Sequence, residues 1–251
     1  MSQEKARQKK SDLRRKKDRL LIAAFVLLLL ITLLTSLSFF ISYDLVTNSF
    51  HSANLDILLL ESQYDLTPAD ERNDLTPNKQ LHKDPRIMNL EQADAFVFLK
   101  VTVPVGMITD VLEDGTKTVR QAQELFRIKT EENKDVTNRE SSFNTLPRSA
   151  DDTEYWVELT DLEEGTDLSG GTRTYVFGYS VFLKQEEVTE TLFDYVQLKN
   201  IVQYEADAGR PLHIGVEAFG IQTDHLDSSL PKGVMTQEQL TEIYRCIEHN
   251  E

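Results

Sequence analysis

The stretch Thr174–Leu183, TYVFGYSVFL, has the strongest strand pattern in the chain. Alternate residues in it are large and apolar or aromatic: Tyr175, Phe177, Tyr179, Val181 and Leu183. Because successive side chains of a strand point to opposite faces, these alternate residues share one face. The stretch therefore predicts a strand that supplies part of a β core.

Further strand patterns lie on both sides of this stretch. The predicted strands are 55–60, 95–103, 122–129, 155–159, 195–204 and 213–222. In strand 55–60, Leu55, Ile57 and Leu59 alternate with Asp56, Leu58 and Leu60, which indicates burial on both faces. Pro104 lacks a ladder donor, so the strand before it should end there or lie at a sheet edge. Short strands separated by turns such as Glu113–Thr116 predict a mainly β fold, an antiparallel β-sandwich over 44–226.

The segments between the strands are polar. Residues 65–84 carry two prolines and predict a loop or an extended crossing. Residues 134–153 are charged and polar and predict an exposed loop. The short run Thr191–Asp194 is predicted to form one helical turn.

The C-terminal part, 227–251, reads as a linker followed by a short amphipathic helix. Thr236 and Gln239 have the spacing of a capping box. Apolar residues then recur at helical spacing: Leu240, Ile243, Tyr244 and Ile247. We expect this helix to pack on the sheet, with binding to a partner as the alternative.

The N-terminal part has the charge pattern of an exported protein. Residues 1–19 hold nine Lys or Arg and three Asp or Glu, a net charge of +6, so the rest carries −15 − 6 = −21. Residues 20–41 contain no charged side chain. At about 1.5 Å per residue, such a helix spans a bilayer core. Residues 1–19 are therefore predicted to be a cytoplasmic tail, with the remainder outside the membrane.

The apolar segment fits either a signal peptide or a permanent transmembrane helix. Signal peptides have shorter apolar regions and end in a small-x-small cleavage site. The only such candidate near the end of the segment is Ser36-Leu37-Ser38. Removal and retention both stay open at this point.

The residue types needed for catalysis do not occur in a recognisable arrangement. The sequence has no H-E-x-x-H, G-x-S-x-G, Walker or G-x-G-x-x-G motif, and its single cysteine, Cys246, excludes an internal disulfide. The acidic body argues against nucleic-acid binding, which needs Lys and Arg. We therefore predict no catalytic, cofactor-binding or metal-binding residue.

The region after the apolar segment resembles TasA/camelysin-type proteins, which carry the SipW-dependent export signal of Gram-positive bacteria. The resemblance rests on Phe40, Asp44, T-N-S-F at 47–50 and L-D-I-L-L-L-E at 55–61. Later stretches match in the same order: Leu75–Asn89, Ala95–Pro104, Thr189–Leu198 and Ile214–Asp224. The matching part runs from about residue 44 to about residue 226.

The resemblance implies a jelly-roll-like β-sandwich, released by a dedicated signal peptidase at the cell surface or in a biofilm matrix. Some members form fibres in which the N-terminal segment of one subunit adds a strand to the next, by backbone pairing at an open sheet edge. The candidate donor here is 43–61. Its residues that match the family pattern are Thr47, Asn48, Phe50, Leu55, Asp56, Ile57, Leu59 and Glu61. The alternative is that this segment pairs within its own domain.

The chain departs from the family at the cleavage region. Members tend to have alanines there, whereas this chain has Ser38-Phe39-Phe40-Ile41. The residues that would form this region are Ser36, Ser38, Phe40, Ile41 and Asp44. The sequence therefore predicts an exported, non-catalytic surface or matrix protein. A permanently anchored binding domain and a camelysin-like metallopeptidase are the alternatives, although no zinc-ligand set is recognisable.

Overall fold

The computed structural model describes residues 48–52, 56–72, 76–112, 114–136, 140–145, 147, 149, 153–159, 171–202, 213–223 and 233–248. The chain divides into two compact units, Met1–Ser42 and Tyr43–Glu251, and all the described residues belong to the second. The basic tail (1–19) and the apolar segment (20–41) lie outside them. No helix among the described residues is long and apolar enough to cross a membrane.

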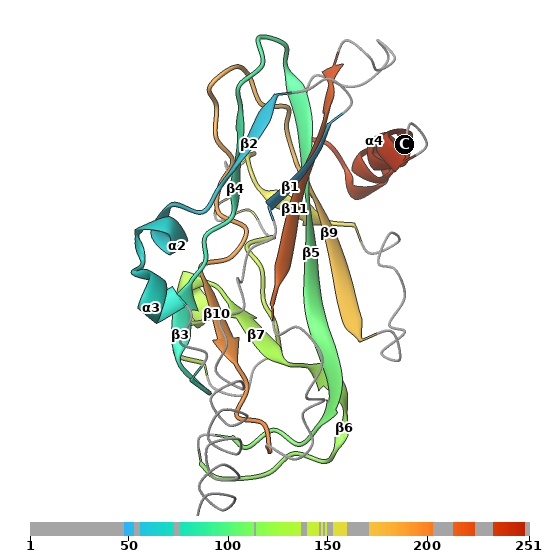
Figure 1. Cartoon of the computed structure of the whole chain (residues 1–251). Helices are drawn as coiled ribbons and strands as arrows, with labels where there is room; N and C mark the ends of the chain where they lie inside the picture. Colours follow the sequence, from blue (N-terminus) through green and yellow to red (C-terminus); the bar gives the residue numbers. More distant parts are fainter. Residues whose placement is uncertain are drawn as a thin grey trace, which may run out of the picture. The chain divides into compact units, whose positions relative to one another are not determined.

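The described part of the chain is mainly β (Figure 1). Its largest sheet has the order β1 (Asn48–Ser52), β11 (Gly215–Gln222), β5 (Ala95–Ile108), β9 (Thr172–Tyr179) and β8 (Trp156–Glu158), with β6 (Gln121–Glu124) pairing with β5. A second sheet has the order β3 (Gln80–His82), β10 (Tyr195–Leu198) and β7 (Phe126–Lys129). A third consists of β2 (Ile57–Leu60) and β4 (Arg86–Asn89). The helices are α2 (Ser62–Leu66), α3 (Ala69–Arg72), the 3-10 turn η2 (Glu131–Asn133) and α4 (Gln237–Glu248).

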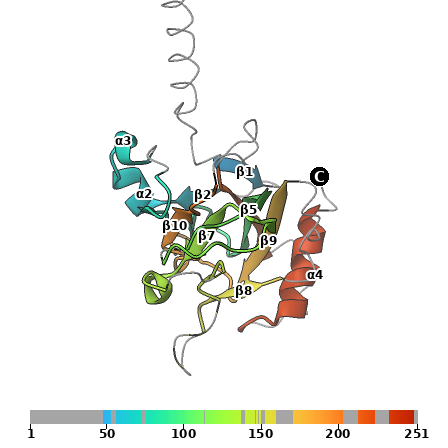
Figure 2. The same cartoon turned by 90° about the horizontal axis from the view of Figure 1, so that it is seen from below.

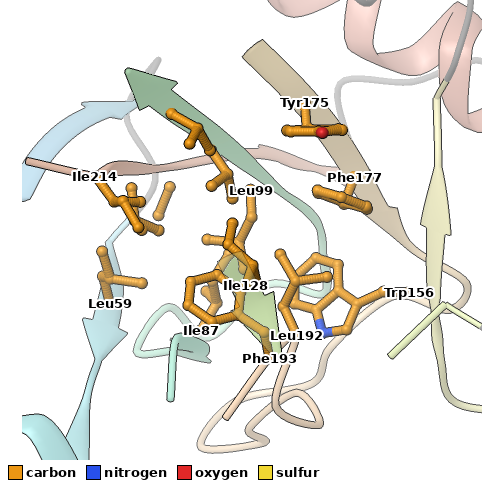
Figure 3. Close-up of a cluster of buried hydrophobic side chains, with 14 of the residues drawn as sticks. Leu59, Ile87, Leu99, Ile128, Trp156, Tyr175, Phe177, Leu192, Phe193 and Ile214 are labelled. Carbon is orange, nitrogen blue, oxygen red and sulfur yellow. The ribbon is translucent and has the colours of Figure 1, made fainter. Parts of the chain in front are cut away.

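The main core receives side chains from all three sheets. β5 contributes Val97, Leu99, Val101 and Val103, and β9 contributes the predicted stripe of Tyr175, Phe177 and Tyr179. Figure 3 shows Leu59 and Ile87 from the two-stranded sheet and Ile128 from the three-stranded sheet in the same cluster. The period of two in these strands thus produces one shared apolar interior.

The other face of the large sheet is covered by α4 (Figure 2). Phe96 and Phe98, at the intervening positions of β5, pack there with Leu240 and Tyr244 of the helix. Gly178 permits this approach, since an added Cβ would lie 3.0 Å from the Phe98 ring and 3.2 Å from Leu240. The predicted packing of the C-terminal helix on the sheet is confirmed.

The predicted capping box also forms at the start of α4. The Thr236 N–H donates to the Gln239 side-chain oxygen at 2.9 Å, and the Gln239 N–H donates to the Thr236 hydroxyl at 3.4 Å. The exposed Cys246 lies near the other end of the helix.

The strand at Ala95 continues through Pro104, so the predicted end there is wrong. Val105 donates its N–H to the carbonyl of Gly171, which leaves the nitrogen of Pro104 facing the other side of β5. On that side β11 makes its last pair with Thr102, and β6 begins pairing at Val105. Pro104 stands where the neighbouring strand changes, so its missing N–H interrupts no ladder.

Three other local predictions need correction. The predicted strand 122–129 is two strands in different sheets, because the chain changes partners at Leu125, whose N–H donates to the Pro104 carbonyl. Thr191–Asp194 forms bends and no helical turn. The predicted loop 65–84 contains the helix α3 and the strand β3.

Further corrections concern burial and strand ends. Leu58 is 36% exposed, so β2 is buried on one face and not on both. β9 ends at Tyr179, before Leu183, which pairs with Ala95 in an isolated bridge. Within the predicted exposed loop 134–153, Phe143 is partly buried and packs against the rings of Tyr175, Phe177 and Phe193.

Candidate functional site

β1 forms an edge of the large sheet, beside β11 (Figure 1). The two strands are parallel, from Asn48 opposite Val216 to Ser52 opposite Gly220. Every other pairing between the described strands is antiparallel, so the predicted antiparallel arrangement holds for these pairs and not for β1. Parallel pairs are slightly less stable per residue than antiparallel ones. β1 is therefore a short edge strand of the large sheet, and its backbone pairs on one side only, with β11.

β2 follows β1 in the chain but is held differently. It pairs antiparallel with β4, from Ile57 opposite Asn89 to Leu60 opposite Arg86. Ile57 and Leu59 point into the core, where they are 5% and 6% exposed. Burying side chains of this size contributes about 1.5–3 kcal/mol each. β2 is thus part of the core of its own domain.

A buried polar cluster fixes the end of β2. We call it the Lys83 cluster; it consists of Glu61, Ser62, Tyr64, Lys83, Asp84 and Arg86. The Lys83 ammonium donates to Glu61 Oε1 at 2.6 Å, and these side chains are 0% and 3% exposed. The ammonium also lies 4.9 Å from the centre of the Tyr64 ring. Together these contacts hold the residue after β2 against the residues that precede β4.

Asp84 holds the beginning of α2 in the same cluster. Its carboxylate accepts the backbone N–H groups of Gln63 at 2.8 Å and Tyr64 at 3.4 Å. Arg86 donates to Asp84 Oδ2 at 3.2 Å and to the Ser62 hydroxyl at 2.8 Å. A carboxylate is favourable beside the free N–H groups of a helix N-terminus. The motif Lys83-Asp84-Pro85 therefore fastens both the end of β2 and the turn that follows.

The Lys83 cluster has the electrostatics of a buried structural ion pair. Burial lowers the pKa of Lys83, although the nearby charge of Glu61 and its hydrogen bond act in the opposite direction. Removing one partner of such a pair leaves a buried charge without compensation, which costs several kcal/mol. The cluster can therefore fix a strand in place.

A second polar network joins the strands at another part of the fold. Glu124 accepts hydrogen bonds from the hydroxyls of Tyr175 and Ser141, the latter at 2.6 Å, and Arg173 lies 3.6 Å away. Burial raises the pKa of Tyr175, and the charge of Glu124 adds to this effect. This network ties β6 and β9 to the segment at Ser141, which explains why that part of the predicted loop is fastened.

His82 and His213 are the histidines whose side chains the structure describes. The His82 ring lies 4.5 Å from the ring of Tyr195, whose hydroxyl donates to Glu131 at 2.7 Å. His213 precedes β11, and Glu217 lies within it. Among the residues that the structure describes, no three His, Cys, Asp or Glu side chains are grouped as metal ligands.

The structure divides the candidate donor segment into separate parts. Asn48 and Phe50 lie in β1, Asp56 is exposed, Ile57 and Leu59 lie in β2, and Glu61 belongs to the Lys83 cluster. Outside the described residues lie Thr47 and Leu55 of the donor, and Ser36, Ser38, Phe40, Ile41 and Asp44 of the cleavage region.

Sequence reasoning missed Lys83, Asp84 and Arg86 as partners of Glu61. Both halves of the cluster lie in stretches that carry the family resemblance, L-D-I-L-L-L-E and K-D-P. An acid that ends one apolar strand and a lysine that precedes another were the available signal. Their pairing depends on the antiparallel register of β2 and β4.

No protein-family model, curated protein sequence or solved structure matches the chain. The function must therefore be inferred from the sequence and from the geometry of the described residues.

Proposed function

We propose that the chain is an exported, non-catalytic protein of a cell surface or biofilm matrix, which self-assembles by strand addition with β1 as the donor. The position of β1 carries this proposal: it is an edge strand, paired on one side with β11, and it follows the apolar segment closely. Backbone pairing at a sheet edge is a recurrent mode of protein association. The β1 strand of a second copy can make the same backbone pairs with β11.

The contrast between β1 and β2 narrows the donor within the segment 43–61. β2 contributes buried side chains to its own core, and Glu61 after it forms the buried pair with Lys83. Withdrawing β2 would expose both the apolar face and the charges. The donor in this proposal is therefore the part that ends at Ser52, and β2 stays in its own domain.

The proposal also includes a specific type of β fold. We place the described domain among jelly-roll-like β-sandwiches, in which the large sheet faces the shorter strands. The shared apolar cluster between the strands supports this assignment. In this assignment, the parallel pairing of β1 is an exception to the antiparallel arrangement, at one edge of the large sheet.

The proposed location follows from the N-terminal charge pattern. The chain inserts through 20–41 during export, with 1–19 in the cytoplasm, and a signal peptidase releases it for self-association or for contact with matrix proteins. The body of the chain has a net charge of −21, which does not favour nucleic acid as a partner. Intact mass measurement on medium and membrane fractions of a Gram-positive host tests release. A new N-terminus between about residues 37 and 43 supports it, and an intact chain in the membrane contradicts it.

A disulfide that holds β1 in its own domain tests strand addition. Ser49 lies opposite Glu217, so Ser49→Cys with Glu217→Cys brings two thiols to paired positions. Neighbouring strands bring paired Cα atoms to about 5 Å, within the range a disulfide spans. Cys246→Ser removes the native thiol. The oxidised variant is prepared by closing the disulfide in the isolated monomer, before assembly. We expect this oxidised chain to stay monomeric, and the reduced chain to form fibres visible by electron microscopy.

The matched control joins β11 to β5 instead. Lys100 also lies opposite Glu217, so Lys100→Cys with Glu217→Cys adds a disulfide that leaves β1 unrestrained. This control should assemble in both redox states. Assembly of the oxidised β1–β11 variant would contradict strand addition. Chelator-sensitive proteolysis by the purified chain would contradict the non-catalytic part and favour the peptidase.

A further inference from the structure

We propose that the outward face of the β2–β4 sheet is a second contact between copies, which forms beside the exchanged β1. This inference rests on the proposed strand addition. The surface, called here the outer patch, consists of Leu58, Leu60, Met88, Leu90 and Val188. Its occupant is the neighbouring copy that has accepted β1.

The outer patch has an apolar row at its centre, with Arg86 opposite Leu60 and the exposed Asp56 beside Leu90. Leu58 lies opposite Met88, and Met88 pairs in turn with Val188, so their side chains form one row across three adjacent segments. The exposed fractions are 36% for Leu58, 39% for Leu90 and 39% for Val188. Leu60 and Met88 are half-buried. Scattered exposed apolar side chains are ordinary, whereas adjacent ones form a candidate contact surface.

The length of the chain places the second copy next to this patch. Only four residue steps separate Ser52, the end of β1, from Asp56, the residue before β2. Four steps of an extended chain reach at most about 14 Å. A copy that receives β1 at its β11 edge therefore lies within that distance of the start of β2. Because the inner face of β2 is buried, β2 presents its outer face to the neighbour.

The size of β1 supports the need for a second contact. β1 has five residues, and a net hydrogen bond contributes about 1 kcal/mol. Stable protein interfaces bury about 800 Å² on each partner, more than five edge residues supply. The outer patch provides apolar area near the start of β2, where the short connection between Ser52 and Asp56 holds the neighbouring copy.

The test replaces the row with threonine, which keeps the preference for strand structure. The triple variant Leu58→Thr, Met88→Thr, Val188→Thr is compared with Met107→Thr, Val119→Thr. Met107 and Val119 are 51% and 80% exposed and lie outside the patch. The exported chain is examined by sedimentation over a range of concentrations. We expect the triple variant to need about tenfold or more protein for assembly, and the control to assemble like the parent.

The outcomes separate this inference from the function on which it rests. If the triple variant assembles like the parent, the outer patch is not a contact, whereas the β1–β11 disulfide result still decides strand addition. If the oxidised β1–β11 variant assembles, strand addition itself fails. Should circular dichroism show that the triple variant is misfolded, Val188→Lys alone replaces it, with the same expected direction. Unchanged assembly of folded Val188→Lys would overturn the inference.

Discussion

β1 and β2 are successive strands of one N-terminal segment, yet they are held by different means. β1 pairs in parallel at a sheet edge, whereas β2 pairs antiparallel and buries one face in the core. β2 also ends at the buried ion pair of Glu61 with Lys83. The comparison shows how a few residues of sequence can contain both a strand held at one edge and a strand fixed in the core.

The largest expected effect comes from breaking the buried ion pair. Lys83→Met removes the ammonium and leaves the 3% exposed Glu61 without its partner. We expect the free energy of unfolding to fall by about 3–5 kcal/mol, measured by urea denaturation of the exported chain. The double variant Glu61→Met, Lys83→Met should recover most of this loss, because it leaves no buried charge.

A surface ion pair provides the control for this prediction. Lys184 and Glu187 lie 3.4 Å apart and are 66% and 47% exposed. Lys184→Met should change the free energy of unfolding by less than about 0.5 kcal/mol. A similar loss for Lys83→Met and Lys184→Met would mean that the Lys83 cluster does not fix β2.

The two faces of β2 should differ in their contribution to stability. Leu59→Ala removes a side chain that is 6% exposed, and we expect a loss of about 2–4 kcal/mol. Leu58→Ala, on the outer face, should cost less than about 1 kcal/mol in the monomer. Equal losses in thermal or urea unfolding would contradict the assignment of Leu59 to the core and Leu58 to the surface.

The alkaline pH dependence of stability should carry the signature of Lys83. Burial lowers its pKa below the ordinary 10.5. Between the lowered pKa and 10.5, the unfolded chain binds more protons than the folded chain, so the free energy of unfolding rises with pH. The slope from one such group is at most about 1.4 kcal/mol per pH unit. The double variant Glu61→Met, Lys83→Met should lose this rise. If its free energy of unfolding depends on pH as in the parent, Lys83 is not the cause of the rise.

A proline in β1 should cost less stability than a proline in β2. Ser49→Pro removes at most one ladder donor from an edge strand, so we expect the monomer to lose no more than about 1.5 kcal/mol. Leu58→Pro in β2 should cost at least about 3 kcal/mol, since Leu58 lies in a ladder beside buried residues. Comparable losses in urea unfolding would remove the distinction between a marginal and a fixed strand.

Local patterns predicted most strands because they depend on alternation within one segment. The stripe at Tyr175, Phe177 and Tyr179 and the helix after Thr236 were confirmed for this reason. Pro104 was misread because its effect depends on which neighbour lies on each side of β5. A change of sheet at Leu125 likewise leaves no mark in the alternation.

The candidate site was predicted less completely than the strands. Asn48, Phe50 and Glu61 were named within one donor segment, but the boundary between β1 and β2 came from their partners. The pairing of Glu61 with Lys83 spans 22 residues and depends on strand register. Long-range pairs of this kind are set by the tertiary fold, and no local propensity specifies them.

The most direct test of strand addition uses two different copies of the chain. One carries Ser49→Cys and the other Glu217→Cys, both with Cys246→Ser, so that neither contains a second thiol. The two copies are mixed under assembly conditions and oxidised, and the products are separated by mass. Ser49 lies opposite Glu217 within one chain. If β1 is exchanged between copies, Ser49 of one copy takes the same position opposite Glu217 of the next, and we expect a disulfide-linked heterodimer. Assembled material without that heterodimer would contradict strand addition by β1.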